Sequence, residues 1–464
     1  MRLRNRLTGA AVVVVVSGLG LAGCGQSSDG GSGDTIELTI AQNSISGGKN
    51  AAGADYITNW VIPQFEAAEK AKGKNVKVKF VPSGVDDEQY KTKLSLDLKS
   101  GKGADVFDLD GIWAGEFAEA GYIKPLSDVV GADADSWDGW AQIPQSVQGL
   151  ATYNGKKYAL PIGTDGRVLY FNKTLFQKAG LPADWQPKSW QEILDAGAKL
   201  KAAGVPVPIQ INAGTAMGEA TTMQGVLPLL AGAGGQLMQD GKWTGASQPL
   251  KDALGFYQKI YGGSGLGDPK LQQEAKGRDK SFQQFAGNEI GILMESDYLW
   301  RGVLNPATGV AKMADRDQSV GYALIPAEEP GKGINGQDFV SMSGGGLRTV
   351  NPNSKHPKEA FELAAFTLSP DGLKEETKND NVRITPRADV NKEILSTEPV
   401  LTYISDKVVP LTAFRPPVAA YTQVSVALQE ATADVVGGKS PDQAAADYQS
   451  KLEGIVGGAG NVAS

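Results

Sequence analysis

Acidic and aromatic side chains follow one buried strand pattern at short spacing. Residues 104–109 (ADVFDL) predict a strand with both faces buried, and Asp108, Asp110 and Trp113 lie within or directly after it. Ligands of open α/β sheets bind beyond the carboxyl ends of such strands. Carboxylates make charge-assisted hydrogen bonds to hydroxyl groups, and an indole offers a large flat face. These residues are therefore candidate ligand contacts, the alternatives being that Asp110 caps a helix and that Trp113 packs inside the fold.

The supply of histidine and cysteine limits the chemistry of the chain. His356 is the only histidine and lies in a polar loop before Pro357, while Cys24 is the only cysteine. A metal site built from cysteine and histidine is therefore excluded, and we expect no metal, no cofactor and no catalytic residue. Two Gly-x-Gly-x-x-Gly matches, at 18–23 and 331–336, lack the strand–turn–helix context that phosphate binding requires.

The N-terminus has the order of a secretory signal. A basic segment at 1–6 precedes an apolar run at 7–21, which is shorter than the roughly 20 residues that span a bilayer. The ending Leu-Ala-Gly-Cys resembles the bacterial lipobox, whose cysteine is lipidated. We therefore predict a lipoprotein signal peptide over 1–23, a lipid anchor on Cys24 and a flexible Gly/Ser-rich tether over 24–34. The alternatives are an ordinary signal peptide and a single membrane anchor.

Composition indicates a large secreted body without disulfides. The chain has 464 residues and a formal net charge of −7. Its length after the signal suits two domains, each with its own core. The basic excess of a nucleic-acid-binding protein is missing, so we expect no nucleic-acid partner.

The elements that must position these side chains alternate between strands and helices. Apolar spacing predicts strands at 35–41, 76–81 and 104–109, separated by helices at 55–70 and 88–100. This order is typical of βαβ units with a parallel sheet.

A later helix has clear boundaries. Ser189 and Glu192 form a capping-box pattern, and Gly204 ends the helix. The last helix opens at Ser440-Pro441, with proline at its first position.

Short motifs follow one another along nearly the whole mature chain. They are 104–126 (with ADV and EAGYIKPL), 155–161 (GKKYALP), 169–181 (LYFNK…FQKAGL), 189–192 (SWQE), 285–292 (FAGNEIGI), 343–346 (SGGG), 352–355 (PNSK) and 384–390 (ITPRADV). In this order they resemble the extracellular solute-binding proteins of bacterial ABC sugar importers, the group that includes maltose-binding protein. One departure is that Ser296-Asp297-Tyr298 stands where this family usually has Gly-x-Trp, with Trp300 two residues later.

The resemblance implies an α/β fold of the two-lobed periplasmic-binding-protein type (type II), with mostly parallel sheets and a ligand cleft between the lobes. It places crossovers between the lobes near 162–167, 289–295 and 341–347. We expect an N-terminal lobe of 35–162 plus 292–342 and a C-terminal lobe of 163–291 plus 343–464. Ligand binding would close the lobes by hinge motion.

The resemblance also assigns candidate ligand contacts near the crossovers. An acidic contact of the family falls at Asp165, close to Arg167. The alternative for this pair is an ion pair that braces the hinge. Further candidates from crossovers and strand ends are Tyr298, Trp300, Asp338, Gln42 and Asn43, and weaker ones are Asn212, Glu219, Met223, Arg383 and Tyr421.

The function that this implies is capture of a sugar, in particular an oligosaccharide, and its delivery to the membrane subunits of an ABC importer. The protein would be a monomer on the extracellular face of the cell membrane, anchored through Cys24, and not an enzyme. One alternative keeps the fold but gives it a non-sugar ligand or a sensory role. A more remote one is a secreted glycoside-processing enzyme, which could use an Asp/Glu pair without histidine.

Overall fold

The first sheet is built from the βαβ units at the start of the described chain. The structure is a computed structural model that describes residues 35–378 and 382–463. β1 pairs in parallel with two strands, and two short returning strands extend the sheet in antiparallel fashion. The strand order is β2 (Val76–Pro82), β1 (Ile36–Gln42), β3 (Val106–Asp110), β15 (Gly346–Val350) and β6 (Leu160–Pro161).

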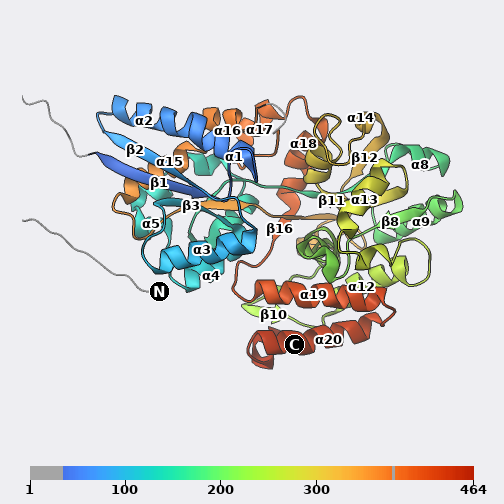
Figure 1. The fold of residues 1–464 in the computed structure, drawn as a ribbon. Helices are drawn as coiled ribbons and strands as arrows, with labels where there is room; N and C mark the ends of the chain where they lie inside the picture. The colour runs from blue at the N-terminus through green and yellow to red at the C-terminus, as the bar shows by residue number, and fades with distance from the viewer. Residues whose placement is uncertain (1–34, 379–381, 464) are drawn as a thin grey trace, which may run out of the picture.

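Helices cover both faces of this sheet (Figure 1). Together with the sheet they form what we call the first lobe. The helices are α1 (Ala51–Tyr56), α2 (Ile62–Ala71), α3 (Asp87–Lys99), α4 (Ala114–Glu119), α15 (Pro357–Phe366), α16 (Pro370–Glu376) and α17 (Ala388–Ile394). The predicted helix at 55–70 is confirmed, but a π-helical segment, Ile57–Val61, separates α1 from α2.

The second sheet has four strands of mixed direction. β7 (Arg167–Asn172) is antiparallel to both β12 (Val320–Ala323) and β11 (Ile290–Ser296), and β11 is parallel to β8 (Val207–Gln210). All residues of β7, β8 and β11 are buried.

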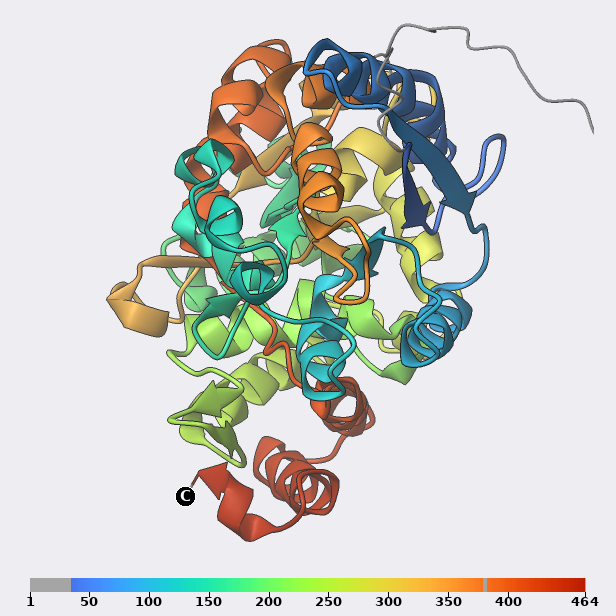
Figure 2. The ribbon, with the colours of Figure 1, turned by 90° about the vertical axis from the view of Figure 1, so that its left-hand side faces the viewer.

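Helices packed on the second sheet complete the second lobe. They include α8 (Lys173–Lys178), α9 (Trp190–Ala202), α11 (Leu227–Gly232), α12 (Gln248–Tyr261), α13 (Gly277–Ala286), α19 (Tyr421–Val436) and α20 (Pro441–Ile455). Figure 2 shows α19 and α20 at one end of the molecule, away from the first sheet.

Within the described residues, the chain crosses between the lobes three times. The first crossing, at 162–166, joins β6 to β7, and the second, at 344–345, joins β14 (Phe339–Ser343) to β15. The third returns to the second lobe through the π-helical segment Ile404–Val408 and β16 (Thr412–Phe414), which pairs in parallel with β14. The second and third crossings therefore run side by side.

The two-lobed α/β fold agrees with the prediction, but three details of the prediction are wrong. The crossover expected near 289–295 is instead β11, which lies inside the second sheet between β7 and β8. The sheets are mixed rather than mostly parallel, because β7 and β15 enter their sheets from a crossing and run against their neighbours. The segment 292–342, expected in the first lobe, supplies β11, β12 and the start of the second crossing, and these strands pair with β7. Conversely, 346–394, expected in the second lobe, adds β15 and three helices to the first.

The predicted boundaries of two helices are confirmed. Ser189 accepts a hydrogen bond from the Glu192 amide at 3.3 Å, and the Glu192 carboxylate accepts one from the Lys188 amide at 2.8 Å. Gly204 follows α9 in the left-handed region, with φ +76°. At α20, Ser440 caps the Gln443 amide and Pro441 is the first helical residue.

The predicted signal peptide, the tether and Cys24 lie outside the described residues. Over 35–378 and 382–463, no helix combines the length and the apolar character that would let it cross a membrane.

Candidate functional site

A cavity of about 410 Å³ lies where the lobes meet. The first lobe contributes Gln42, the start of α1 and the segment around Arg383, and the second lobe contributes Arg301. Between them stand the first and second crossings, including Asp165 and Gly345. A concave site shared by two lobes and their hinge is a common location for a small-molecule ligand.

Asp165 is held in place from two directions. Its Oδ1 accepts a hydrogen bond from the Gly344 amide at 2.7 Å, and it forms an ion pair with Arg167. Burial acts to raise the pKa of Asp165, but Arg167 and the Gly344 amide outweigh it and hold the pKa below its usual value. The carboxylate side chain remains 26% exposed, so an ionised acceptor faces the cavity.

Arg167 supports Asp165 rather than facing the cavity. Its side chain is only 6% exposed, and its Nη1 also donates to the Met342 carbonyl at 3.2 Å. The Ser341 hydroxyl accepts a hydrogen bond from the Arg167 amide at 2.9 Å, which joins the start of β7 to β14. The predicted alternative of an ion pair that braces the hinge therefore describes Arg167, while Asp165 both braces and lines the site.

The second lobe presents Arg301 to the cavity. Arg301 Nε donates to Asp297 Oδ2 at 2.9 Å, and the guanidinium lies over the Tyr298 ring at 5.5 Å. Asp297 itself is buried, and its Oδ1 has no hydrogen-bond partner. Burial raises the pKa of Asp297, and nearby Asp165 adds to the rise against the opposing effect of Arg301. Tyr298 is 38% exposed beside Arg301 but does not line the cavity.

The first lobe presents Gln42 and Arg383. Gln42 Nε2 donates to Asp108 at 2.8 Å, and Asp108 in turn accepts two hydrogen bonds from the buried Arg348. Arg383 Nη2 lies 2.5 Å from Glu376, and both residues line the cavity. Gln42, the contact that the sequence predicts from this lobe, is therefore held in place by the buried ion pair of Asp108 and Arg348.

Besides Arg167 and Tyr298, four further predicted residues lie away from this cavity. Trp113 is 5% exposed and stacks on Phe117, which is the predicted alternative of packing within the fold. Trp300 is 3% exposed, with Arg316 over its ring at 3.8 Å. The other two are Asn43, whose amide group bonds Val85 and Asp87, and Asp338, which is exposed at the far end of β14.

Asp110 belongs to a neighbouring group of charges. Its Oδ1 accepts a hydrogen bond from the Ile112 amide, as in the predicted capping role, and lies 3.6 Å from Arg415 Nη2. Arg415 Nη1 also donates to Glu219 at 3.0 Å. Asp110 is deep enough for desolvation to raise its pKa, against the opposing effect of Arg415. Its side chain nevertheless stays 44% exposed.

Sequence reasoning missed Arg301, Glu376 and Arg415. Arg415 directly follows β16 on the third crossing, so the argument that selected Arg167 on the first crossing could have found it. Arg301 directly follows Trp300, and the sequence favours the aromatic residues Tyr298 and Trp300 as the contacts of this segment. Nothing in the local pattern of Glu376, at the end of α16, points toward the cavity.

The guanidinium groups of Arg301 and Arg383, which line the cavity, and of Arg167 and Arg415, which lie beside it, are each paired with a carboxylate. Each is ion-paired, so the cleft presents directional hydrogen-bonding groups with little net charge. The pairs are Arg167–Asp165, Arg301–Asp297, Arg383–Glu376 and Arg415–Glu219.

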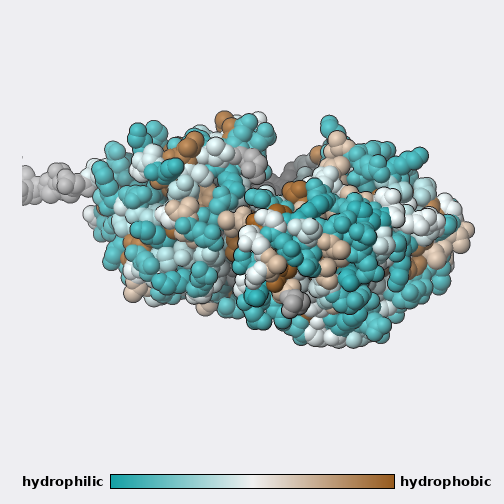
Figure 3. Space-filling model, turned by 90° about the horizontal axis from the view of Figure 1, so that it is seen from below, coloured by the Kyte–Doolittle hydropathy of each residue, from teal (hydrophilic) through white to brown (hydrophobic). Residues whose placement is uncertain are grey.

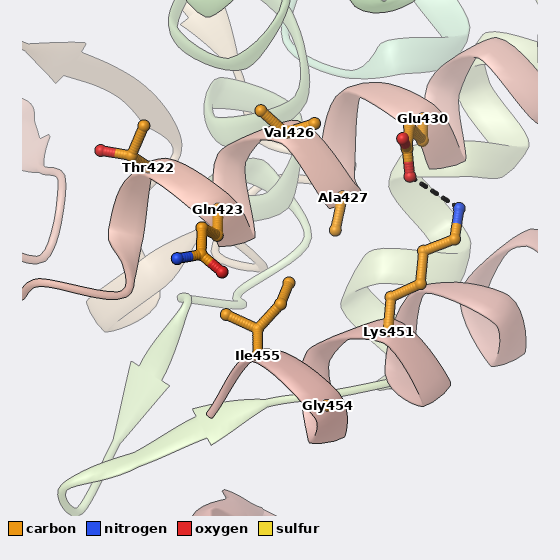
Figure 4. Close-up of a pocket in the computed structure, with 8 residues that line it drawn as sticks. All are labelled: Thr422, Gln423, Val426, Ala427, Glu430, Lys451, Gly454 and Ile455. Carbon is orange, nitrogen blue, oxygen red and sulfur yellow. Dashed lines mark hydrogen bonds and ion pairs between the residues drawn. The ribbon is translucent and has the colours of Figure 1, made fainter. Parts of the chain in front are cut away.

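Two other cavities have a different character. A groove of about 520 Å³ runs between α19 and α20, lined by Val426 and Ile455 and closed at one end by the Glu430–Lys451 ion pair of 2.7 Å (Figure 4). Seen from below, the molecule presents a mostly hydrophilic surface with small scattered apolar groups (Figure 3). An apolar cavity of about 230 Å³ lies behind the hinge, against Met342 and Phe414. Neither offers the converging polar groups of the interlobe cavity.

Comparison with known proteins identifies the family of this chain. Residues 50–374 match the family described as bacterial extracellular solute-binding protein. The chain belongs to this family. It is a solute-binding protein of the kind that serves ABC transporters, and its family and fold are those of binding proteins rather than enzymes.

Solved structures of other solute-binding proteins share the fold. An ABC transporter solute-binding protein from Thermotoga lettingae, bound with alpha-D-tagatose, is 27% identical with a TM-score of 0.67, covering 91% of this chain and 100% of its own. The cyclic alpha-maltosyl-1,6-maltose binding protein from Arthrobacter globiformis is 19% identical with a TM-score of 0.72, covering 91% and 99%. A Sinorhizobium fredii protein named probable amino-acid ABC transporter periplasmic-binding protein is 26% identical over 80% of each chain.

Proposed function

We propose that this solute-binding protein captures a sugar, in particular an oligosaccharide, by closing its lobes around it and delivers it to the membrane subunits of an ABC importer. It acts as a monomer on the extracellular face of the membrane, to which a lipid on Cys24 anchors it. The family, the tagatose-bound structure and the protein named for binding cyclic alpha-maltosyl-1,6-maltose support the class of ligand.

The observation that carries the proposal is the fixed, ion-paired polar lining of the interlobe cavity. Asp165 on the hinge, Arg301 of the second lobe and Arg383 of the first offer charge-assisted hydrogen bonds from different sides. Sugar hydroxyls both donate and accept, so a mixture of carboxylates and guanidinium groups suits them. A ligand that contacts both lobes favours the closed arrangement by its differential affinity for it.

An amino acid is the second candidate ligand. The Sinorhizobium fredii relative carries that name, and the cavity holds guanidinium and carboxylate groups that suit an α-carboxylate and an α-amino group. The ion pairing of each guanidinium weighs against it, because a charged ligand group would have to displace an existing partner.

Thermal unfolding separates the two candidates. The mature chain with Cys24→Ser would be unfolded in the presence of monosaccharides, oligosaccharides and amino acids. A ligand at a hundredfold excess over its dissociation constant stabilises the folded state by about 2.7 kcal/mol, which raises the midpoint. A shift confined to sugars supports the proposal, and a shift confined to amino acids replaces it with the second candidate.

The anchor and the importer need their own tests. The wild-type protein expressed in a bacterium should fractionate with membranes and release a lipid-modified N-terminal peptide that begins at Cys24. The Cys24→Ser variant should be soluble. Deletion of the gene should abolish uptake of the sugar that raises the midpoint, and intact uptake would favour a sensory role.

A further inference from the structure

A cavity of about 500 Å³ lies in the first lobe, away from the hinge. Its walls come from α2, from α15 and from the segment 130–138. Among the described residues, none that lines it also lines the cavity at Asp165. It is therefore a separate cavity, and its size suits a small-molecule ligand.

Aromatic side chains form much of its wall. Phe65 and Phe361 are buried, and Phe366 is half-buried. Phe366 meets Phe65 edge to face, with 5.5 Å between the ring centroids. Across the cavity, the half-buried Trp137 meets Trp140 in the same way at 5.4 Å. An apolar ring packs well on such a surface, and the faces of tryptophan and phenylalanine also attract cations.

Glu69 places a buried carboxylate in the same wall. Its side chain is 0% exposed, and its Oε1 accepts a hydrogen bond from Lys72 at 2.6 Å. Its Oε2 has no hydrogen-bond partner among the described residues, since Lys74 Nζ stays 3.7 Å away. A buried oxygen in this position favours a ligand that donates a hydrogen bond to it.

Negative charge is in excess around the cavity. Of the three cations that line it, Arg387 is neutralised by two hydrogen bonds to Asp389, at 2.7 Å and 3.0 Å. The other two, Lys72 and Lys358, are 57% and 66% exposed, which places them at the rim. They stand against four carboxylates, those of Glu69, Asp133, Asp138 and Glu362. This excess favours a positively charged ligand.

We propose that this cavity is a second ligand site, which binds an organic amine that carries an aromatic ring. Its ammonium group donates a hydrogen bond to Glu69 Oε2, and its ring packs against Trp137 and Phe366. An ammonium has three donors, so it also reaches carboxylates at the rim. All the lining residues belong to one lobe, so this ligand does not bridge the lobes, and the inference is independent of the proposed sugar in the cleft.

Calorimetric titration of the mature chain with Cys24→Ser tests the proposal. The probes are phenethylamine, phenethyl alcohol and hydrocinnamate, which share a phenylethyl group and are a cation, a neutral molecule and an anion at neutral pH. Phenethylamine should bind about tenfold more tightly than the alcohol, and hydrocinnamate should not bind. This comparison needs no substitution in the cavity.

Two variants assign the binding to the cavity. Glu69→Gln keeps the side-chain size and should weaken binding of phenethylamine about tenfold, the effect of one lost charge-assisted hydrogen bond. It should change the affinity for phenethyl alcohol by less than about twofold. Trp137→Leu should weaken binding of both molecules by about threefold or more, because both lose the same ring contact.

Glu66→Gln is the matched control. Glu66 lies three residues earlier in α2 and is ion-paired with Lys77 at 2.6 Å, as Glu69 is with Lys72, but it does not line the cavity. It should leave the affinity for phenethylamine unchanged. Equal thermal midpoints of the ligand-free Glu69→Gln and Glu66→Gln proteins would exclude misfolding as the cause of a difference.

Three outcomes would overturn the proposal. If phenethylamine did not bind at millimolar concentration, the cavity would not be an amine site. If it bound no more tightly than phenethyl alcohol, the carboxylates would not select a cation. If a folded Glu69→Gln protein bound it as wild type does, the amine would lie elsewhere, for example against the carboxylates of the interlobe cleft. None of these outcomes affects the proposed sugar ligand.

Discussion

At the scale of single residues, the ionised state of Asp165 links the hinge to the cleft. Its pKa in the folded protein lies below the unfolded value of about 3.9, so the carboxylate stabilises the fold above that pH. This contribution decreases as the pH falls through the folded pKa. We predict that Asp165→Asn is less stable than wild type at pH 7 and that the difference shrinks below about pH 4.

Urea denaturation at pH 7, 5, 4 and 3 measures this difference. Asp240→Asn, at an exposed turn, serves as the control and should track wild type throughout. A gap between Asp165→Asn and wild type that stays constant from pH 7 to 3 would contradict the assigned role of the charge.

Gly115 of the first lobe packs against the backbone that follows β16. A Cβ there would stand 1.3 Å from the Pro417 carbonyl oxygen and 3.0 Å from the Val418 Cα, both of them backbone atoms. We predict that Gly115→Ala lowers the free energy of unfolding by about 1–3 kcal/mol or more, as overpacking does. Gly149→Ala, with no atom within 4 Å of its Cβ, should be neutral or slightly stabilising. Equal midpoints in urea for the two variants would show that the backbone at Pro417 moves away from residue 115 with little loss of stability.

At the scale of elements, the N-terminal cap of α9 can be predicted from the local sequence alone. Ser189 satisfies the Glu192 amide, one of the first four amides that the helix leaves unpaired. We predict that Ser189→Ala costs about 1 kcal/mol of stability in urea denaturation. Ser95→Ala in α3, away from any helix end, should cost nothing, since alanine favours helix. A cost at Ser95 matching that at Ser189 would argue against capping as the cause.

Local patterns predicted such elements well, but not their distribution between lobes. The strands at 36–42, 76–82 and 106–110 and the helix α9 all follow from apolar spacing and caps. The placement of β11 and β15 depends on pairing with strands more than 100 residues away, which periodicity cannot report. Sheet membership therefore had to come from the structure.

The candidate contacts show the same division. Asp165 and Gln42 were found because strand ends and crossings are positions of known geometry. The sequence could not place Trp113 and Trp300, because an aromatic side chain suits a core and a sugar cleft equally well, and the structure buries both. Arg301 and Glu376 reach the cavity, and Arg415 reaches Asp110 beside it, through tertiary folding alone.

At the scale of the whole molecule, two lobes joined by three crossings should respond to ligand by closing. A sugar held by Asp165 and Arg301 can draw the lobes together only if it also contacts the first lobe, where Arg383 lines the cavity. We predict that the sugar that raises the midpoint also lowers the radius of gyration measured by small-angle X-ray scattering. Arg383→Ala should weaken binding about tenfold and reduce the contraction at saturating sugar.

Lys374→Ala separates this effect from a general loss of charge on the same wall. Lys374 is 35% exposed and ion-paired with Glu393, against 32% for Arg383 with Glu376, but it does not line the cavity. It should bind and contract like wild type. If saturating sugar left the radius of gyration of the wild-type protein unchanged, ligand capture would not involve closure. If Arg383→Ala contracted fully, closure would be driven by contacts in the second lobe and at the hinge alone.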